Sequence, residues 1–361
     1  MNRVMNFSAG PSALPLSVLQ RAREEMLDFA GTGMSVMEQS HRGKAYESLH
    51  LRTVQRLHQL MGLGDQHEVL LLQGGATQLF AQIPMNLLEK TESAGYIDLG
   101  TWGAKALAAG TAVSAHAELA AKADAMLPEA VRIDPRWKYV HMTSNETVHG
   151  VQWHGALTGL PFDAKNVNVV CDASSDIFSR PTNLSDYALV YAGAQKNLGP
   201  AGIVITAVRK DLIESGRKDI PSFFQFRTHA KEQSMHNTPP TFVVYMVSLV
   251  LDWIEEMGGL ESMAKRTEQK SRAIYQAIDR SGGFYRGPVT LRARSEMNPV
   301  FRLPTEELEA RFVKEAEANG MVGLKGHRSV GGIRVSLYNA VEPSSAEALA
   351  DFMAHFVGGA G

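Results

Sequence analysis

Short apolar runs alternate with helical stretches between residues 15 and 255 of the chain. The runs are bounded by glycine or polar turns and occur at residues 69–72, 138–142, 167–171, 187–191 and 202–208. Short runs that are rich in β-branched and other apolar residues are typical of strands buried on both faces. Because they alternate with helices, the pattern predicts an α/β fold built on a mostly parallel sheet.

The pattern changes near Gly258 and Gly259, where a smaller α+β unit is expected to begin. A long helix is predicted over residues 260–279, and Thr305 can cap a further helix that ends at Gly320. The chain therefore has two predicted domains, which suits its length.

Two local patterns describe the end of the chain. Residues 333–338 alternate between apolar and polar side chains, which predicts a half-buried strand. Ser344 and Glu347 have the spacing of a capping box, so we expect them to begin the last helix.

Chemically distinctive residues stand directly after three of the predicted strands. They are the stretch Gly74-Gly75-Ala76-Thr77, Asp172 and Lys196. In parallel α/β sheets, ligands bind just beyond the carboxyl ends of the strands. We therefore expect these residues to share one site.

Lys196 follows small residues, which let another molecule approach the backbone closely. A neutral lysine amine can attack a carbonyl carbon, although a lysine in a turn is more often a surface residue. Asp172 ends an apolar run, where a carboxylate is costly without a partner. A pyridoxal phosphate (PLP) enzyme needs such an acid to keep a proton on the pyridine nitrogen, but a turn or cap aspartate is the alternative. One strand–helix–strand excursion between Asp172 and Lys196 would bring both to one cofactor.

The glycine stretch at residues 74–78 opens a predicted helix, whose free N–H groups and dipole suit a phosphate. The chain has no Walker loop, and His67 stands where a dinucleotide fingerprint needs its third glycine. Trp102 could stack on a flat cofactor or pack in the core. Thr147 could donate a hydrogen bond to the phenolic oxygen of the cofactor.

The sequence contains two His-Arg pairs, His41-Arg42 and His327-Arg328. Arg334 follows the second pair closely in the chain. Arginine binds carboxylate and phosphate through paired hydrogen bonds, so these clusters suit a doubly anionic substrate. Each pair alone is more often a solvated surface feature. No histidines have the HExxH spacing, and we expect no metal site.

Composition and charge narrow the range of possible partners and cellular locations. The net charge of −2 gives no overall attraction to nucleic acid, and the single Cys171 excludes an intramolecular disulfide. The N-terminal residues lack the apolar core of a signal peptide, and the longest apolar run is only about half of a membrane span. We expect a soluble, cytoplasmic protein without nucleic-acid or membrane partners.

Several motifs occur in an order that is highly specific. They are residues 7–11 (FSAGP), 35–43 (SVMEQSHRG), 191–197 (YAGAQKN), 236–241 (HNTPPT), and 326–334 with 338–340. This set spans nearly the whole chain and resembles the phosphoserine aminotransferases, which are class V, fold-type I PLP enzymes. The resemblance implies a large PLP-binding domain over residues 16–258 and a small domain over residues 259–361 together with residues 1–15.

The resemblance also implies roles for the cofactor site. Lys196 would be the Schiff-base lysine, Asp172 would pair with the pyridine nitrogen, Trp102 would stack on the ring and Thr147 would contact its hydroxyl. The residues that would hold the cofactor phosphate are Ala76, Thr77 and Gln195, joined by Asn237 and Thr238 of the partner subunit.

For the substrate, the resemblance implies that Arg334 binds the α-carboxylate and that Ala9 lines the site. His41 and Arg42, with His327 and Arg328 of the partner subunit, would bind the substrate phosphate or the side-chain carboxylate of glutamate. Some members have arginine where this chain has Thr77, which puts the affinity for phosphorylated substrates in doubt.

The implied activity is transfer of an amino group between L-glutamate and 3-phosphohydroxypyruvate, giving O-phospho-L-serine and 2-oxoglutarate. The same enzyme would also form 4-phosphohydroxy-L-threonine for pyridoxine biosynthesis, and would act as a homodimer with shared active sites. One alternative is another class V aminotransferase that acts on a small unphosphorylated amino acid. Cysteine desulfuration is rejected because its only candidate nucleophile, Cys171, lies in a buried strand, and a non-catalytic α/β protein would leave Lys196 and Asp172 unexplained.

Overall fold

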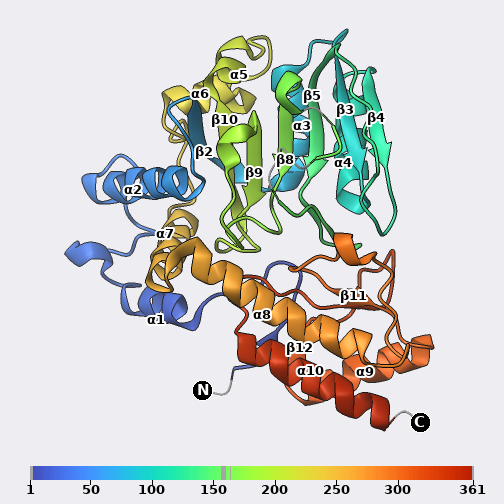
Figure 1. The fold of residues 1–361 in the computed structure, drawn as a ribbon. Coiled ribbons are helices and arrows are strands. Elements are labelled where there is room, and N and C mark those ends of the chain that lie inside the picture. Colours follow the sequence, from blue (N-terminus) through green and yellow to red (C-terminus); the bar gives the residue numbers. More distant parts are fainter. Residues whose placement is uncertain (1–2, 156–159, 163, 360–361) are drawn as a thin grey trace.

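A seven-stranded sheet forms the centre of the computed structural model, which describes residues 3–155, 160–162 and 164–359 (Figure 1). Its strands, in spatial order, are β2 (His67–Gly74), β10 (Gly202–Arg209), β9 (Leu189–Gly193), β8 (Val169–Asp172), β5 (Trp137–Thr143), β3 (Ser93–Asp98) and β4 (Ala117–Lys122). Only β10 is antiparallel to its neighbours. The prediction of an α/β fold with a mostly parallel sheet is confirmed.

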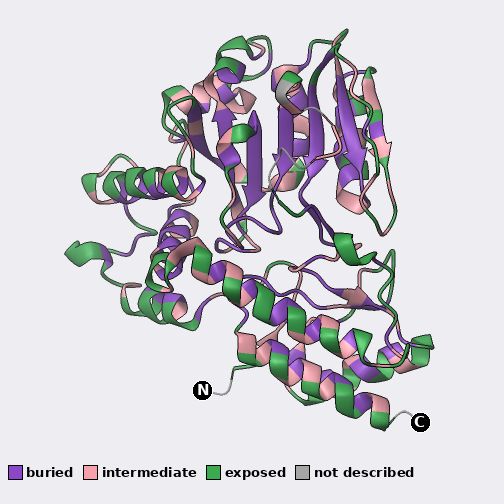
Figure 2. Cartoon of the chain, in the orientation of Figure 1, coloured by how far each residue is buried: buried purple, intermediate pink, exposed green. Residues whose placement is uncertain are grey.

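Alternate residues of the strands enter two different hydrophobic cores. Val169 and Cys171 of β8 lie in one core, whereas Val170 lies in the other. The second core is covered by α3 (Ala76–Leu87), α4 (Thr101–Val113), α5 (Lys210–Ser215) and α6 (Phe226–Lys231). The first core is covered by α1 (Leu16–Glu24), α2 (Lys44–Leu60) and α7 (Thr241–Glu256). Figure 2 shows the central strands largely buried, as strands covered on both faces should be.

A third core belongs to the unit that follows α7. Its elements are α8 (Gly259–Asp279), α9 (Glu306–Ala318), α10 (Pro343–Gly358), the parallel pair β1 (Met5–Asn6) and β12 (Met321–Val322), and the antiparallel pair β11 (Val300–Phe301) and β13 (Ile333–Arg334). Phe7 of the N-terminal segment is fully buried in this core beside residues of α8 and α9. This packing supports the predicted domain boundaries, which stay a prediction. Residues 1–2 and 360–361 of the predicted small domain lie outside the described residues.

The local predictions had mixed outcomes. The helix over residues 260–279 is confirmed as α8, and Thr305 caps α9 by accepting the N–H of Leu308 at 3.3 Å. The capping box is wrong: α10 begins at Pro343, and no side chain caps it. Glu347 instead accepts a hydrogen bond from Gln269 at 2.8 Å.

Two further expectations are wrong for reasons of tertiary structure. The predicted half-buried strand at 333–338 is paired as a strand only at Ile333 and Arg334. Ser336 and Tyr338 are fully buried because the Asn298 amide hydrogen-bonds both. No α-helix separates β8 from β9. Residues 173–188 form turns and a short 3₁₀ segment, yet the two strands are still parallel neighbours.

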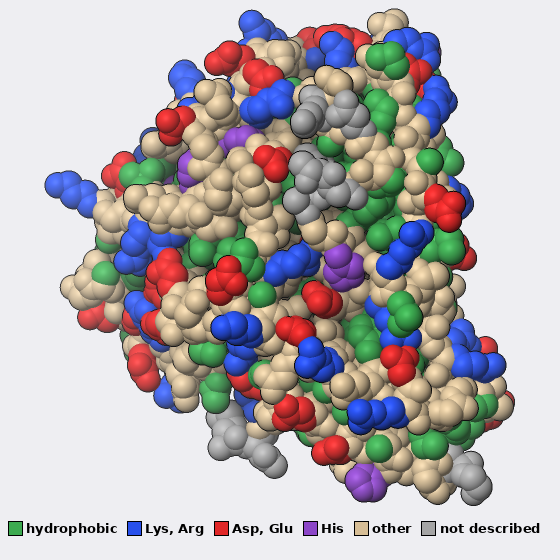
Figure 3. Space-filling model, in the orientation of Figure 1, with side chains coloured by type: hydrophobic (Ala, Val, Ile, Leu, Met, Phe, Trp, Pro, Cys, Tyr) green, Lys and Arg blue, Asp and Glu red, His purple; other side chains and the backbone are tan. Residues whose placement is uncertain are grey.

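The surface carries mixed charge. Figure 3 shows acidic and basic side chains interspersed over the face in view, in keeping with the net charge of −2. Of the helices that the structure describes, none is both long and apolar enough to cross a membrane.

Candidate active site

Lys196 lies just past the carboxyl end of β9, where its amine meets the hydroxyl of Thr147. Lys196 Nζ donates a hydrogen bond to Thr147 Oγ1 at 2.9 Å. Thr147 is buried in the turn between β6 (Asn145–Glu146) and β7 (Val151–Gln152). The N-terminal segment braces the lysine loop, because the Ser12 hydroxyl donates to the carbonyl of Lys196 and the Ser12 N–H donates to that of Gln195. The backbone of Lys196 is therefore fixed while its amine faces the strand ends.

The indole of Trp102 lies beside this amine. Lys196 Nζ is 5.5 Å from the centroid of the ring, and Lys105 Nζ is 4.5 Å from it. Trp102 belongs to the first turn of α4.

Asp172 is the last residue of β8 and is only 4% exposed. Its Oδ1 accepts the N–H of Ser174 at 2.9 Å. Burial raises the pKa of Asp172, and the Ser174 hydrogen bonds and the Lys196 charge only partly oppose this effect. A buried carboxylate in this position gains stability from a cationic N–H partner, which a pyridinium ring provides.

The helix start that is expected to bind the cofactor phosphate lies where β2 meets α3. Ala76 and Thr77 begin the helix directly after Gly75, which has no side chain that could cap it. The first N–H groups of α3 are therefore free to bind an anion. Gln73 donates to the carbonyl of Thr238 at 2.6 Å, so the 237–238 loop of this same chain approaches the end of β2. Which subunit's cofactor Asn237 and Thr238 serve stays a prediction.

Positive charge gathers at the substrate side. Arg334 is half-buried, burial lowers its pKa, and its Nε has no hydrogen-bond partner among the described residues. The pKa of His327 is lowered by burial and by nearby Arg334, Arg328, Lys105 and His149. Sequence analysis missed Lys105 and His149.

Two other predicted substrate residues have different surroundings. The carbonyl of Ala9 accepts the hydroxyl of Tyr338 at 2.9 Å, which ties the N-terminal segment to the Arg334 region. His41 and Arg42 precede α2, and within the described part of this chain no contact joins them to Lys196 or Arg334. The described contacts join Lys196 to Thr147, Trp102 and Asp172, and they join His327 to Arg334. The position of His41 and Arg42 relative to the site stays a prediction.

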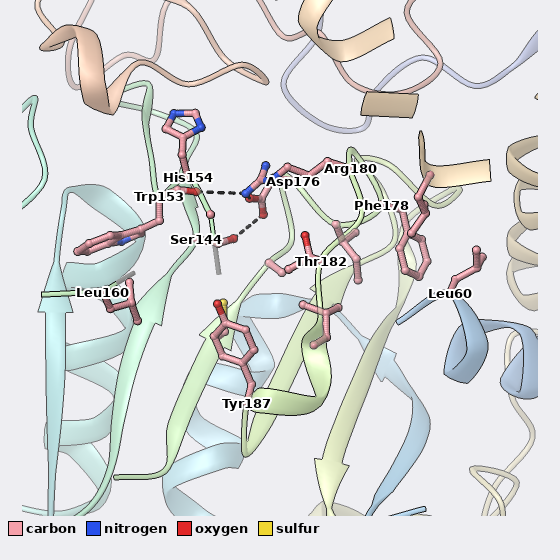
Figure 4. A pocket seen from close by; sticks show the side chains of 16 residues that line it. Leu60, Ser144, Trp153, His154, Leu160, Asp176, Phe178, Arg180, Thr182 and Tyr187 are labelled. Atoms are coloured by element: carbon pink, nitrogen blue, oxygen red, sulfur yellow. Dashed lines mark hydrogen bonds and ion pairs between the residues drawn. The ribbon is translucent and has the colours of Figure 1, made fainter. Parts of the chain in front are cut away.

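A separate cavity lies behind the end of β8 (Figure 4). Ser144, Asp176 and Arg180 point toward one another there, and Asp176 accepts hydrogen bonds from the other two. Its volume of about 30 Å³ is too small for a cofactor and suits about one water molecule. Cys171 also lines it, and burial raises the pKa of this thiol, which leaves it unsuited to nucleophilic chemistry.

The residues around Lys196 fit PLP chemically. They offer an amine, a buried carboxyl whose pKa is raised by burial, a planar ring and a helix start for the phosphate. No group of three or more His, Cys, Asp or Glu residues that could hold a metal ion occurs in the described ranges.

Comparison with known proteins agrees with this reading. The class-V aminotransferase family profile matches residues 4–349. The chain is 49% identical to the phosphoserine aminotransferase of Herpetosiphon aurantiacus, over 98% of both chains. It is similar to the structure of phosphoserine aminotransferase from Bacillus circulans subsp. alkalophilus, with a TM-score of 0.95, 48% identity and 99% of both chains covered.

A PLP-bound phosphoserine aminotransferase from Trichomonas vaginalis is also similar, with a TM-score of 0.88, 33% identity, and 98% of this chain and 100% of that chain covered. The match extends through both predicted domains rather than through the sheet alone. The chain therefore belongs to the class-V aminotransferases and, within them, to the phosphoserine aminotransferase family.

Proposed function

We propose that this protein is a PLP-dependent phosphoserine aminotransferase that interconverts L-glutamate and 3-phosphohydroxypyruvate with 2-oxoglutarate and O-phospho-L-serine. The observation that carries the proposal is the hydrogen bond of 2.9 Å from Lys196 Nζ to Thr147 at the strand ends, beside Trp102 and Asp172. Relatives of this name match over nearly the full chain, which supports the substrate choice.

When bound, PLP supplies an electron sink for negative charge that develops at the α-carbon of the substrate. Asp172 holds the proton on the ring nitrogen, since a buried carboxylate is stabilised by that N–H. Trp102 stacks on the ring and Thr147 contacts its hydroxyl. The backbone of Ala76 and Thr77 and the side chain of Gln195 bind the phosphate, with Asn237 and Thr238 of the partner subunit.

Lys196 moves the proton at the α-carbon. Its amine acts first as general base and then as general acid, which requires it to reach a substrate held beside Trp102. Arg334 binds the α-carboxylate through paired hydrogen bonds, and Ala9 lines the site. The unpaired Nε of Arg334 supports this role, because a buried guanidinium without a carboxylate leaves hydrogen-bonding capacity unused.

The second anionic group of either substrate meets His41, Arg42, and His327 and Arg328 of the partner subunit. The unit of catalysis is then a homodimer with shared active sites. We further propose a cytoplasmic enzyme that also forms 4-phosphohydroxy-L-threonine, since that product carries the same phosphate.

A paired assay tests the substrate class. With glutamate as donor, phosphohydroxypyruvate should react far faster than unphosphorylated hydroxypyruvate, and Arg42→Ala should slow the phosphorylated substrate much more than pyruvate. Equal rates for the two hydroxypyruvates would favour the alternative of an aminotransferase for small unphosphorylated amino acids. Equal losses with both oxoacids in Arg42→Ala would remove Arg42 from recognition.

A complementation experiment tests the shared sites. Chains with Lys196→Ala are mixed with chains carrying Arg328→Ala under subunit exchange. If Arg328 serves the neighbouring site, a mixed dimer places both lesions in one site and leaves the other whole, so activity returns. Within one chain, the charge of Arg334 already lowers the pKa of His327. Verified mixed dimers without activity would therefore assign His327 and Arg328 to the site of their own chain.

A further inference from the structure

Glu146 is a buried carboxylate that the proposed mechanism leaves unused. It is 0% exposed and lies in β6, directly before Thr147. Its Oε2 accepts the backbone N–H of Trp102 at 2.9 Å, while its buried Oε1 has no hydrogen-bond partner within the described ranges. Burying a carboxylate costs free energy, so the group that hydrogen-bonds Glu146 indicates why a carboxylate lies at this position.

Helix α4 needs a cap that its own sequence cannot supply. The N-cap residue is Gly100, which has no side chain to accept the N–H groups of the first turn. A Cβ at Gly100, where φ is +149°, would lie 2.3 Å from the ring of His149. Glycine is therefore required at this position, and the acceptor must come from elsewhere in the fold. Glu146 provides it, with a negative charge that also suits the helix dipole.

The same short segment fixes the lysine. Thr147, the neighbour of Glu146, accepts the hydrogen bond from Lys196 Nζ. The other neighbour, Asn145, anchors the segment: its amide donates to Ser175 and Asn298 at 2.8 Å each. One short stretch thus binds the backbone N–H of Trp102 through Glu146 and the amine of Lys196 through Thr147.

We propose that Glu146 is a positioning residue that caps α4 and so sets the ring of Trp102 at the distance from Lys196 that a stacked cofactor requires. The inference rests on the proposed function, because it assigns Trp102 to the cofactor. Burial raises the pKa of Glu146 to about 7. The N–H groups of Trp102, Val148 and Gly103 and the charge of Lys196 oppose this rise, as expected for a carboxylate that accepts from the start of α4. The fold retains this carboxyl despite that cost.

The test compares Glu146→Ala and Glu146→Gln with the control Thr305→Ala. Thr305 caps α9 in the other unit, so its loss removes a helix cap that does not touch Trp102. The readouts are the dissociation constant for PLP, the induced circular dichroism of the bound cofactor, and KM against kcat. Glu146→Ala should weaken PLP binding about tenfold, the equivalent of one helix cap, and should reduce the induced dichroism.

Glu146→Gln keeps an oxygen acceptor and should stay within about threefold of wild type, since a neutral acceptor still caps the helix. Thr305→Ala should bind PLP as the wild type does. If Glu146→Ala does not fold, Glu146→Asp replaces it, because its shorter side chain withdraws the carboxyl from Trp102.

Three outcomes would overturn the inference. Wild-type affinity and dichroism in Glu146→Ala would remove Glu146 from cofactor positioning while leaving the proposed function intact. An equal loss in Thr305→Ala would show that any lost cap weakens binding through stability. A wild-type protein that binds no PLP would overturn the proposed function and this inference together.

Discussion

Lys196 and Lys270 both direct their amines into the protein, but their surroundings differ. Lys270 in α8 is 0% exposed, and its amine donates to the carbonyls of Leu337 and Tyr338 at 2.9 and 2.8 Å. Lys196 is half-buried, and among the described residues its amine has one hydrogen-bond acceptor, the hydroxyl of Thr147. Lys270, which lies away from the carboxyl ends of the strands, is therefore more deeply buried than Lys196.

The two lysines differ in the hydrogen-bonding capacity that their neighbours leave unused. Lys270 is held by two carbonyl acceptors and has no room to react, so its role is to join α8 to the segment that follows Arg334. Arg334 Nε has no hydrogen-bond partner among the described residues, and burial raises the pKa of Asp172, whose charged form a cationic partner would stabilise. A reactive lysine is therefore recognised by the unmet requirements of its neighbours, and depth of burial alone would select the wrong residue.

The largest expected effect separates the two lysines by activity. Lys196→Met should lower turnover by at least about 10²–10⁴-fold, because it removes the group that moves the α-proton. The visible absorption of bound cofactor should change with it. Lys270→Met, measured in the same transaminase assay, should retain most of its turnover. A Lys196→Met protein with wild-type activity would place the reactive amine elsewhere.

The second-largest effect on activity is expected from substitution of Asp172. Asp172→Asn cannot hold the ring-nitrogen proton as an anion, so transition-state stabilisation should fall by about 2–5 kcal/mol, the scale of a broken buried charge pair. The measurement is kcat/KM with glutamate. Asp176→Asn serves as the control, because Asp176 lies behind β8 and is hydrogen-bonded to Ser144 and Arg180. Unchanged turnover in Asp172→Asn would refute the assignment.

Stability should show the reverse ranking of the lysines. At about pH 10, where removing the proton from the amine of the unfolded chain costs less than about 1 kcal/mol, Lys270→Met should cost roughly 2–5 kcal/mol because two buried carbonyls lose their donor. The free energy of unfolding from denaturant titration measures this. A loss below about 1 kcal/mol would mean that water replaces the amine.

The pH dependence of stability offers a smaller test. Burial lowers the pKa of Lys270 to about 7, whereas the unfolded chain keeps the ordinary value of 10.5. Between these values the unfolded state binds more protons, so stability rises with pH and is lost as pH falls toward 7. The gap between wild type and Lys270→Met should therefore narrow by at most about 1.4 kcal/mol per pH unit on acidification. A gap that does not vary with pH would contradict this.

The smallest effect is the stability of the apoprotein with Lys196→Met. One hydrogen bond, to Thr147, is lost, so the expected cost is about 0.5–1.5 kcal/mol. A loss as large as that of Lys270→Met would show that Lys196 also has a structural role, and the contrast between the two lysines would fail.

Sequence alone determined the features that depend on local pattern. The apolar runs predicted the central strands, and the residues that follow those runs predicted Asp172, Lys196 and the glycine turn before α3. This succeeded because the carboxyl ends of parallel strands meet at one edge whatever connects them. It held even though the expected helix between β8 and β9 is absent.

Tertiary structure decided the features whose partners are far apart in the chain. Glu146 caps a helix 44 residues before it, and Lys270 binds carbonyls 67 and 68 residues after it. Ser336 and Tyr338 are buried because Asn298 satisfies them, which reversed the expected half-buried strand. A local pattern records how polar a residue is, but whether a polar group can be buried depends on the partner that folding brings to it.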